Sequence, residues 1–490
     1  MSKVVVLGLD GFNPELVKGW LDDLPNLKKL QQEGIWGKME SSVPPIAPQT
    51  WTCAQSSRNP GVFGFWDFSY RDDFSYGQPK SIDCSVRDKR VNCLHKILPM
   101  IGQKVAIINV PLSWPPPRIP GGYSISSYMT PSLDRGFTWP ESLRNEVHSL
   151  VGEYIIDATE AGVNYRHMEK DRVLKRIYDM DSQRFTLLKH FISKKQCDCV
   201  FTVITGSDRM PHLFYRYFDE QHRRYDPDPR YKNALHDYYV RIDKQIGEIR
   251  DTLDGETALF VHSAHGVQRL DGRINLNEWL IQEGYMVLHE YPSELTTMMK
   301  LKVDWSKTKA WATGYTGQIY LNVKGREPQG IVDPDDYDRL LDELADKIIE
   351  IPDERGNPLK TRVFKRKEIH SGPFAEHGPD LFILFDECRW NISEMVGYGQ
   401  GSIYSFDTPL GPDDGADGLY GYFFIAGPGV PASGERIGAT LLDVAPTVLD
   451  VMDLEIPQEM EGKSILGEEK PARTPEDDEK VRSRLKALGY

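Results

Sequence analysis

The chain has 490 residues, of which 40% are hydrophobic and 27% are charged, a composition typical of an ordinary globular protein. Its formal net charge of −14 argues against a nucleic-acid binder, because nucleic acids are held by clustered positive charge. No stretch approaches the roughly 20 apolar residues that a membrane-spanning helix needs. We therefore expect neither a nucleic acid nor a membrane as a partner.

The six cysteines are scattered along the chain, without the paired spacing of a zinc site or the density of a disulfide scaffold. The sequence begins almost at once with a strand-like run from Lys3 and shows no signal-peptide pattern. Both features predict a reducing, cytoplasmic location.

Apolar runs alternate with amphipathic segments along the chain, and residues 3–9 form an unbroken run typical of a central parallel strand. Asn13 and Pro14 then supply an N-cap and a first-turn proline for a helix. Further buried strands are predicted at 105–109, 200–205, 258–262, 381–385 and 422–426, and helices at about 172–194, 233–253, 334–350 and 441–452. The alternation predicts an α/β fold with a doubly wound, mostly parallel sheet flanked by helices.

Residues 1–465 are interpreted as a single α/β domain with inserted cap segments. The segment at about 61–165 is rich in Pro, Gly, Tyr and Trp and is interpreted as loops and a partial cap. Residues 285–375 resemble a smaller α+β insertion, and residues 466–490 a charged tail with a short helix near 476–488.

Aromatic side chains are concentrated in the predicted cap, where Trp66, Tyr70, Tyr76 and Trp114 could stack a nucleobase. Packing beneath the cap is the preferred interpretation, and no substrate-binding residue is predicted.

Asp10, Asp208 and His265 each follow a different predicted strand, and His212 lies four residues after Asp208. In open α/β sheets, functional residues gather beyond the carboxyl ends of the strands. On a helix, the i,i+4 spacing would place the carboxylate and the imidazole on one face. A helix cap or a core histidine would explain any one of these residues, but the four together favour a divalent-metal site.

A series of ordered sequence blocks extends over nearly the whole chain. The blocks are VLGLDG at 6–11, VPPI at 43–46, Trp51, RNPG at 58–61, Asp208-Arg209 with His212, HG at 265–266, NEWL at 277–280, DWSKT at 304–308, KGREP at 324–328, GPDD at 411–414, GPG at 427–429, DVAPT at 443–447 and LKALGY at 485–490. With these blocks the chain resembles the type I phosphodiesterase and nucleotide pyrophosphatase branch of the alkaline phosphatase superfamily.

The resemblance implies an alkaline-phosphatase-like fold and two divalent ions, often zinc, with a Thr or Ser nucleophile. It implies one ion at Asp208, His212 and a histidine from late in the chain. The other ion would be held by Asp10, the nucleophile and an Asp-His pair that ends at His265. Two such ions stabilise the attacking and the leaving oxygens and activate the nucleophile.

Three positions depart from the family pattern. Ala47, four residues before Trp51, stands where the nucleophile is expected, and Ala264 stands where the pair has its carboxylate ligand. Asp417 takes the place of the late histidine. Since alanine offers neither an attacking oxygen nor a metal ligand, we expect ordinary two-metal hydrolysis to be lost.

The ligands that remain predict one divalent ion of the Mg, Mn or Zn class. They are Asp208, His212 and Asp417, whose extra carboxylate favours Mg, Mn or Ca over zinc. The second site keeps only Asp10 and His265 and is expected to be weak or empty. Nearby, Asp413 and Asp414 could add oxygens or could form an exposed acidic loop that caps a helix.

A neighbouring hydroxyl is a weak substitute for the nucleophile. Thr50 lies one helical turn after Ala47, displaced by roughly 4.5 Å along the axis, and catalytic geometry tolerates far less. Ser42 and Thr52 are weaker candidates, and His262 is interpreted as a packed residue rather than a base.

Three hypotheses about function follow. The first and preferred one is a repurposed pocket that binds a phosphorylated or other anionic small molecule and carries out different chemistry. The second is a metal-dependent phosphodiester or phosphomonoester hydrolase with compensating ligands. The third is a non-catalytic relative that binds a ligand or an active paralogue.

Overall fold

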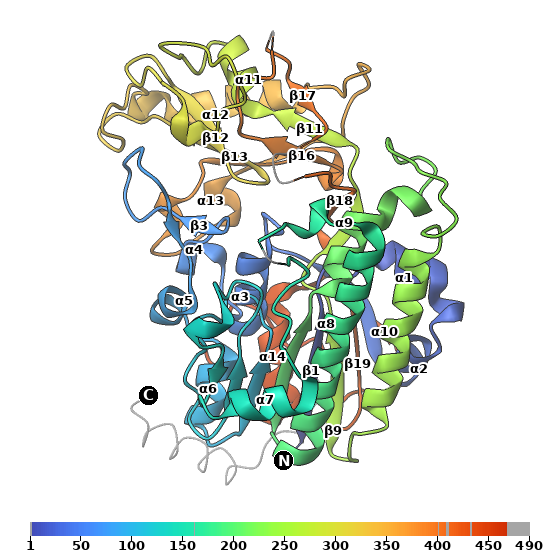
Figure 1. Ribbon diagram of the computed structural model, residues 1–490. Coiled ribbons are helices and arrows are strands. Elements are labelled where there is room, and N and C mark those ends of the chain that lie inside the picture. Colours follow the sequence, from blue (N-terminus) through green and yellow to red (C-terminus); the bar gives the residue numbers. More distant parts are fainter. Residues whose placement is uncertain (1, 161, 400, 408–410, 432–433, 468–490) are drawn as a thin grey trace.

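The computed structural model describes residues 2–160, 162–399, 401–407, 411–431 and 434–467. It has a larger lobe, built around a central sheet, and a smaller lobe that lies above it in the view of Figure 1. The predicted helix at 476–488 lies outside the described residues. Within the described part, no helix is both long enough and apolar enough to span a bilayer.

The central sheet has ten strands in the order β20-β2-β19-β9-β1-β8-β5-β6-β7, with β21 pairing β2. Its strands are β1 Lys3–Leu9, β2 Ile35–Glu40, β5 Val105–Ile108, β6 Tyr123–Ile125, β7 Thr138–Trp139, β8 Cys199–Ile204, β9 Thr257–His262, β19 Tyr420–Ala426, β20 Gly434–Glu435 and β21 Ala439–Thr440. The central strand β1 pairs parallel with both β8 and β9, whereas β19 runs antiparallel to β9 and β2. The predicted α/β fold with a mostly parallel sheet is confirmed.

Helices cover both faces of this sheet, because its central strands are apolar on both sides. On β1, Val5 and Leu7 pack into one core and Val4 and Val6 into the other. The helices of the larger lobe are α1 Pro14–Trp20, α2 Pro25–Glu33, α3 Ala47–Ser56, α4 Pro60–Phe63, α5 Cys84–Arg90, α6 Leu94–Met100, α7 Leu143–Val151, α8 Lys170–His190, α9 Gly206–Phe218, α10 Ala234–Arg250 and α14 Val444–Val451, whereas α11 Leu276–Gln282, α12 Tyr337–Ile349 and α13 Arg366–Ile369 belong to the smaller lobe. Helices α8 and α10 lie on one side of β1, and α3 and α14 lie on the other (Figure 1).

The smaller lobe has its own core between two sheets, β12-β13-β15-β14 and β16-β11-β17. These strands are β11 Gly272–Asn275, β12 Ala310–Thr313, β13 Gly317–Leu321, β14 Arg362–Lys365, β15 Leu381–Leu384, β16 Trp390–Ser393 and β17 Tyr404–Ser405. The strand predicted at 381–385 therefore exists, but it pairs antiparallel with β13 and β14 instead of joining the central sheet. The lobe begins before and ends after the predicted insertion at 285–375.

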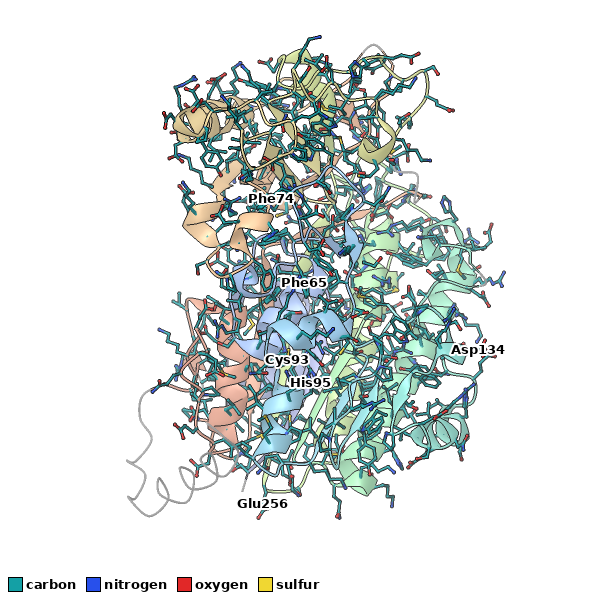
Figure 2. All side chains as sticks on the ribbon, turned by 90° about the vertical axis from the view of Figure 1, so that its left-hand side faces the viewer. Phe65, Phe74, Cys93, His95, Asp134 and Glu256 are labelled. Carbon is teal, nitrogen blue, oxygen red and sulfur yellow. The ribbon has the colours of Figure 1, made fainter. Side chains whose placement is uncertain are left out.

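The segment predicted as a cap, 61–165, divides between the two lobes. Its first part, with β3 Ser69–Tyr70 and β4 Lys80–Ser81, rises from the larger lobe toward the smaller one, and Figure 2 shows Phe74 beside the smaller lobe with Phe65 below it. There Phe74 stacks on His377, with ring centroids 4.9 Å apart. The second part supplies β5, β6 and β7 to the central sheet. The strand predicted at 105–109 is β5, whereas β6 and β7 have three and two residues and are too short to be predicted from the sequence.

Candidate functional site

The turn after β1 brings Asp10 against the start of α9. Gly11 has a φ of +68°, a left-handed conformation that residues with a side chain rarely adopt. A Cβ atom on Gly11 would lie 2.9 Å from the Cα of Asp208. The hydroxyl of Ser207 donates to the backbone carbonyl of Asp10 over 2.6 Å. Glycine at position 11 therefore lets Asp10 and Asp208 lie side by side.

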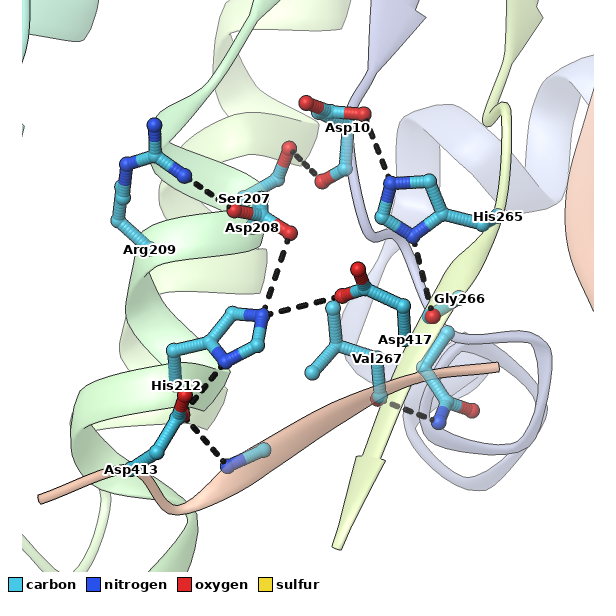
Figure 3. Close-up of polar contacts among 12 residues, drawn as sticks. Asp10, Ser207, Asp208, Arg209, His212, His265, Gly266, Val267, Asp413 and Asp417 are labelled. Atoms are coloured by element: carbon cyan, nitrogen blue, oxygen red, sulfur yellow. Dashed lines mark hydrogen bonds and ion pairs between the residues drawn. The ribbon is translucent and has the colours of Figure 1, made fainter. Parts of the chain in front are cut away.

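Asp208, His212 and Asp417 form the first cluster, as Figure 3 shows. One potential ligand atom from each lies within 4.8 Å of the others. The Nε2 atom of His212 is 3.5 Å from Oδ1 of Asp208 and 3.2 Å from Oδ1 of Asp417. Asp208 and His212 share one face of α9, and Asp417 comes from β18, Gly415–Gly418, which pairs with β10, Gly266–Arg269. The three predicted ligands are thus brought together.

Asp413 fixes the orientation of His212. The Nδ1 atom of His212 donates to Oδ1 of Asp413 over 2.6 Å, which leaves Nε2 facing the other two carboxylates. Arg166 donates to Oδ2 of Asp413 over 2.9 and 3.1 Å. A carboxylate behind a ligating histidine fixes the ring and raises its basicity. Because Asp413 and Asp414 are both buried and Asp414 pairs with Arg216, the prediction of an exposed acidic loop is wrong.

Asp10, Asp208 and His265 form a second cluster whose potential ligand atoms also lie within 4.8 Å of one another. The Nε2 atom of His265 is 3.2 Å from Oδ1 of Asp10, and its Nδ1 atom donates to the carbonyl of Gly266 over 3.2 Å. Asp208 belongs to both clusters. The second site therefore has a third ligand within reach, the carboxylate of Asp208, beyond Asp10 and His265, which were predicted for it from the sequence.

Two neighbouring donors compete with a second ion for these carboxylates. The indole Nε1 of Trp51 donates to Oδ1 of Asp10 over 2.8 Å. The guanidinium of Arg209 donates to Oδ2 of Asp208 over 2.5 Å, and it also bonds Asp157. Because Arg209 binds Oδ2 of Asp208, the other oxygen, Oδ1, faces His212.

Burial opposes a charge on His212 and His265, yet the surrounding carboxylates outweigh it. Asp413 and Asp208 hold the pKa of His212 well above its usual value. Asp417 and Asp10 raise the pKa of His265 to about 10. A buried group of carboxylates that attracts a proton this strongly also attracts a cation. Its mixed oxygen and nitrogen donors fit a divalent ion of the Mg, Mn or Zn class.

The two alanines lie next to the clusters and are buried. Ala47 begins α3 and Ala264 directly precedes His265, and both pack into the apolar core on that face of the sheet. Trp51 lies about one helical turn after Ala47 in α3, and its indole contacts Asp10 of the second cluster. Ala47 is therefore at the start of the helix that contacts this cluster. Apolar packing therefore fills both positions where the family pattern has a polar side chain.

The hydroxyl groups of α3 are engaged within the helix. Thr50, named as a weak substitute for the nucleophile, donates to the carbonyl of Ala47 over 3.3 Å, and Thr52 donates to the carbonyl of Pro48 over 2.7 Å. Ser42, before the helix, accepts from Gln49. None of these hydroxyls has a hydrogen bond to the two clusters in the described part of the chain.

His262 lies at the end of β9 among aromatic rings. Trp51 and Phe201 pack against its ring, and neither ring nitrogen has a hydrogen-bond partner. Burial lowers the pKa of His262 to about 3. It is therefore a neutral packed residue, as the sequence analysis expected.

A cavity of about 680 Å³ lies between the lobes, and we call it the interlobe cavity. Its lining includes Trp66 and Arg71 from the larger lobe, Arg273 and Tyr315 from the smaller lobe, and Asp413 beside the first cluster. Of the aromatic residues considered for base stacking, Tyr76 stacks on Trp305 at 3.7 Å between ring centroids and Tyr70 packs against Arg90.

The sequence analysis did not assign a role to Arg166, Arg209, Arg273 or Tyr315. Each of these residues is far in sequence from at least one residue that it faces across the site. Its neighbours in the sequence give no sign of a role in binding. Only Arg209 had a signal, since it belongs to the Asp208-Arg209 block.

The model of the type I phosphodiesterase/nucleotide pyrophosphatase family matches residues 4–407. Two solved structures share the fold at 13% identity. One is murine ectonucleotide pyrophosphatase/phosphodiesterase 5, an inactive variant in complex with AMP, with a TM-score of 0.51 over 93% of this chain and 96% of that chain. The other is phosphonoacetate hydrolase from Sinorhizobium meliloti 1021 in complex with phosphonoacetate, with a TM-score of 0.55 over 92% and 96%. Among curated proteins no match was found. The chain belongs to the type I phosphodiesterase/nucleotide pyrophosphatase family.

Proposed function

We propose that the protein binds one divalent metal ion at Asp208, His212 and Asp417 and uses this site to hold a phosphorylated or other anionic small molecule. In this proposal the pocket carries out chemistry other than two-metal ester hydrolysis. The observation that carries the proposal is a buried, supported ligand cluster in a chain that has Ala47, and therefore no hydroxyl, at the position where the family resemblance implies the nucleophile.

The side chains around the first cluster have distinct roles in this proposal. His212 presents Nε2 because Asp413 holds its Nδ1 proton, and Arg166 keeps Asp413 in place. Arg209 holds one oxygen of Asp208 and turns the other toward His212. A divalent ion bound there would supply positive charge to an anionic ligand. The second cluster is proposed to stay weakly bound, because Trp51 engages Oδ1 of Asp10.

Two relatives support an anionic ligand. The murine relative is described in complex with AMP as an inactive variant, and the bacterial relative in complex with phosphonoacetate. The net charge of this chain is −14, so attraction of an anion must come from local positive groups such as a bound cation and the buried arginines.

The restoring experiment combines Ala47→Thr, Ala264→Asp and Asp417→His and follows hydrolysis of bis(p-nitrophenyl) phosphate with added Zn²⁺ or Mn²⁺. We expect no turnover above a metal-only blank in the natural chain and metal-dependent turnover in the triple variant. The matched control combines Ala47→Val with the same two other substitutions, because valine has the shape of threonine without its hydroxyl. Chelator-sensitive hydrolysis by the natural chain would overturn the proposal.

A hydrolase with a compensating ligand is the second candidate, and one observation favours it. Asp208 lies within ligand distance of both clusters and could replace the carboxylate that is missing at Ala264. This candidate predicts two ions per chain and hydrolysis that Asp208→Asn abolishes. Single-ion binding without turnover would rule it out.

Two further predictions from the sequence remain proposals. One is a cytoplasmic location, with which the six free and buried cysteines agree. The other is a complex with an active paralogue, which co-purification from the source cells would test.

A further inference from the structure

Arg273 is a buried cation with unused hydrogen-bonding capacity at the inner end of the interlobe cavity. It belongs to β11, is 2% exposed, and has no hydrogen-bond partner at Nε or at one Nη atom. Among the described residues its one ion pair is with Oδ2 of Asp413, at 3.7 Å, which is beyond hydrogen-bond distance. Buried donors without an acceptor are costly, so this arginine calls for an acceptor from outside the chain.

Tyr315 is a second unpaired group on the same side of the cavity. It lies in the turn between β12 and β13, and its buried hydroxyl has no hydrogen-bond partner. The guanidinium of Arg273 is 5.7 Å from the centre of its ring. Asp413 and Asp417 are close enough for their charges to raise the pKa of this already buried phenol, so Tyr315 stays a neutral donor.

Two carboxylates lie beside the turn that carries Tyr315. Burial raises the pKa of Asp67 of the larger lobe and of Glu394 of the smaller lobe, and the backbone N–H groups of Tyr315 and Gly314, respectively, offset part of that rise. Gly314 has a φ of +85°, which allows the turn. Tyr315 therefore lies in a turn that faces acidic groups of both lobes.

Among the described residues, the other buried side-chain atoms of the cavity lining that lack a hydrogen-bond partner are also donors. The indole Nε1 of Trp66 and one Nη atom of Arg71 are buried without a hydrogen-bond partner. Trp and Arg side chains can only donate. Asp413, a carboxylate at the same end, is already engaged by His212 and Arg166. The cavity is thus suited to a ligand rich in acceptors.

We propose that the interlobe cavity binds a second acidic group of the same ligand, with Arg273 and Tyr315 as its hydrogen-bond donors. This inference rests on the proposed function, in which the phosphoryl or other anionic group lies at the first cluster. Asp413 links the two ends, because it bonds His212 and lies 3.7 Å from Arg273. The ligand class is therefore a small organic phosphate that carries a carboxylate or a second phosphoryl group a few bonds away.

The test is isothermal titration of the Mn²⁺-loaded full chain with matched probes. 3-Phosphoglycerate carries a carboxylate, glycerol 3-phosphate has an alcohol in its place, and glycerol 1,3-bisphosphate carries a second phosphoryl group on that alcohol. We expect at least one of the two diacids to bind about tenfold or more tightly than glycerol 3-phosphate, as a buried charge-assisted hydrogen bond provides. The tighter diacid identifies which acidic group the cavity prefers.

Variants locate the effect. Arg273→Gln and Tyr315→Phe should each reduce the ratio of the affinity for the tighter diacid to the affinity for glycerol 3-phosphate. The control Arg355→Gln removes the same charge from an exposed position outside the cavity and should leave the preference unchanged.

The outcomes separate the two proposals without requiring any variant to fold. Equal binding of all three probes by the natural chain overturns this inference alone, and a preference that Arg273→Gln leaves intact does the same. Absence of binding to glycerol 3-phosphate, together with absence of bound metal, overturns the proposed function on which the inference rests.

Discussion

At the scale of single residues, His212 depends on a carboxylate that is not itself a ligand. Asp413 receives the Nδ1 proton of His212 at 2.6 Å, so Nε2 is the nitrogen left for a metal ion. The two residues are 201 positions apart in the chain. The ligands Asp208 and His212 could be predicted from their i,i+4 spacing, whereas the supporting role of Asp413 follows only from tertiary packing.

Asp413→Asn tests this support. The amide keeps the size of the carboxylate but removes the charge that holds the Nδ1 proton, so metal affinity should fall about 10- to 100-fold. Isothermal titration with Mn²⁺ measures the change. Asp251→Asn, at an exposed position after α10, is the charge-matched control. Unchanged affinity in Asp413→Asn would show that His212 needs no such support.

At the scale of elements, the site depends on how closely the β1 turn approaches α9. Strands with unbroken apolar runs, such as β1 and β9, were predictable because both their faces are buried. The strand β2 was missed, although its buried and exposed residues alternate, and β7 has only two residues. Short or edge strands depend on their neighbours, so local sequence signals them poorly.

Gly11→Ala tests the close approach. The new Cβ would lie 2.9 Å from the Cα of Asp208 and would take a φ of +68°, so both strain and overlap oppose it. Gly136→Ala has a similar φ of +80° but nothing within 4 Å. We expect Gly11→Ala to lower the free energy of unfolding by about 1–3 kcal/mol more than Gly136→Ala, as measured by urea denaturation. Equal losses would mean that the turn can move away from α9.

A buried carboxylate joins α8 to the start of α9 and predicts a pH dependence of stability. Asp181 accepts a hydrogen bond from the hydroxyl of Tyr238 and its carboxylate lies against Gly206, and burial raises its pKa to about 6. The folded state therefore binds this proton more tightly than the unfolded state. Its stabilising effect is full below the unfolded pKa, near 4, and is lost as the pH rises through about 6.

Asp181→Asn should remove this dependence, since the amide keeps the shape without the charge. Between pH 4.5 and pH 7, the natural chain should lose up to about 2 kcal/mol of unfolding free energy relative to the variant. Urea denaturation at the two pH values measures the difference. If the unfolding free energy of the natural chain and that of Asp181→Asn changed equally between the two pH values, Asp181 would not be the source of the pH dependence.

At the scale of the whole molecule, two cores meet at the interlobe cavity. The fold of the larger lobe could be predicted from its strongly patterned strands, and the ends of these strands indicated Asp10, Asp208 and His265. Helical spacing added His212, whereas Asp417, inside the short strand β18, was indicated only by the family resemblance. Arg273 and Tyr315 were not predictable, since they come from β11 and from the β12–β13 turn of the smaller lobe. Only the packing of one lobe on the other brings them close to Asp413.

The number of metal ions per chain tests the central claim most directly. Protein purified without chelator, measured by native mass spectrometry and by elemental analysis, should contain one divalent ion, and Asp417→Ala should abolish its binding. The account predicts that this single-ion protein does not hydrolyse bis(p-nitrophenyl) phosphate. Two tightly bound ions with metal-dependent hydrolysis, or no ion even after incubation with Mn²⁺, would contradict it.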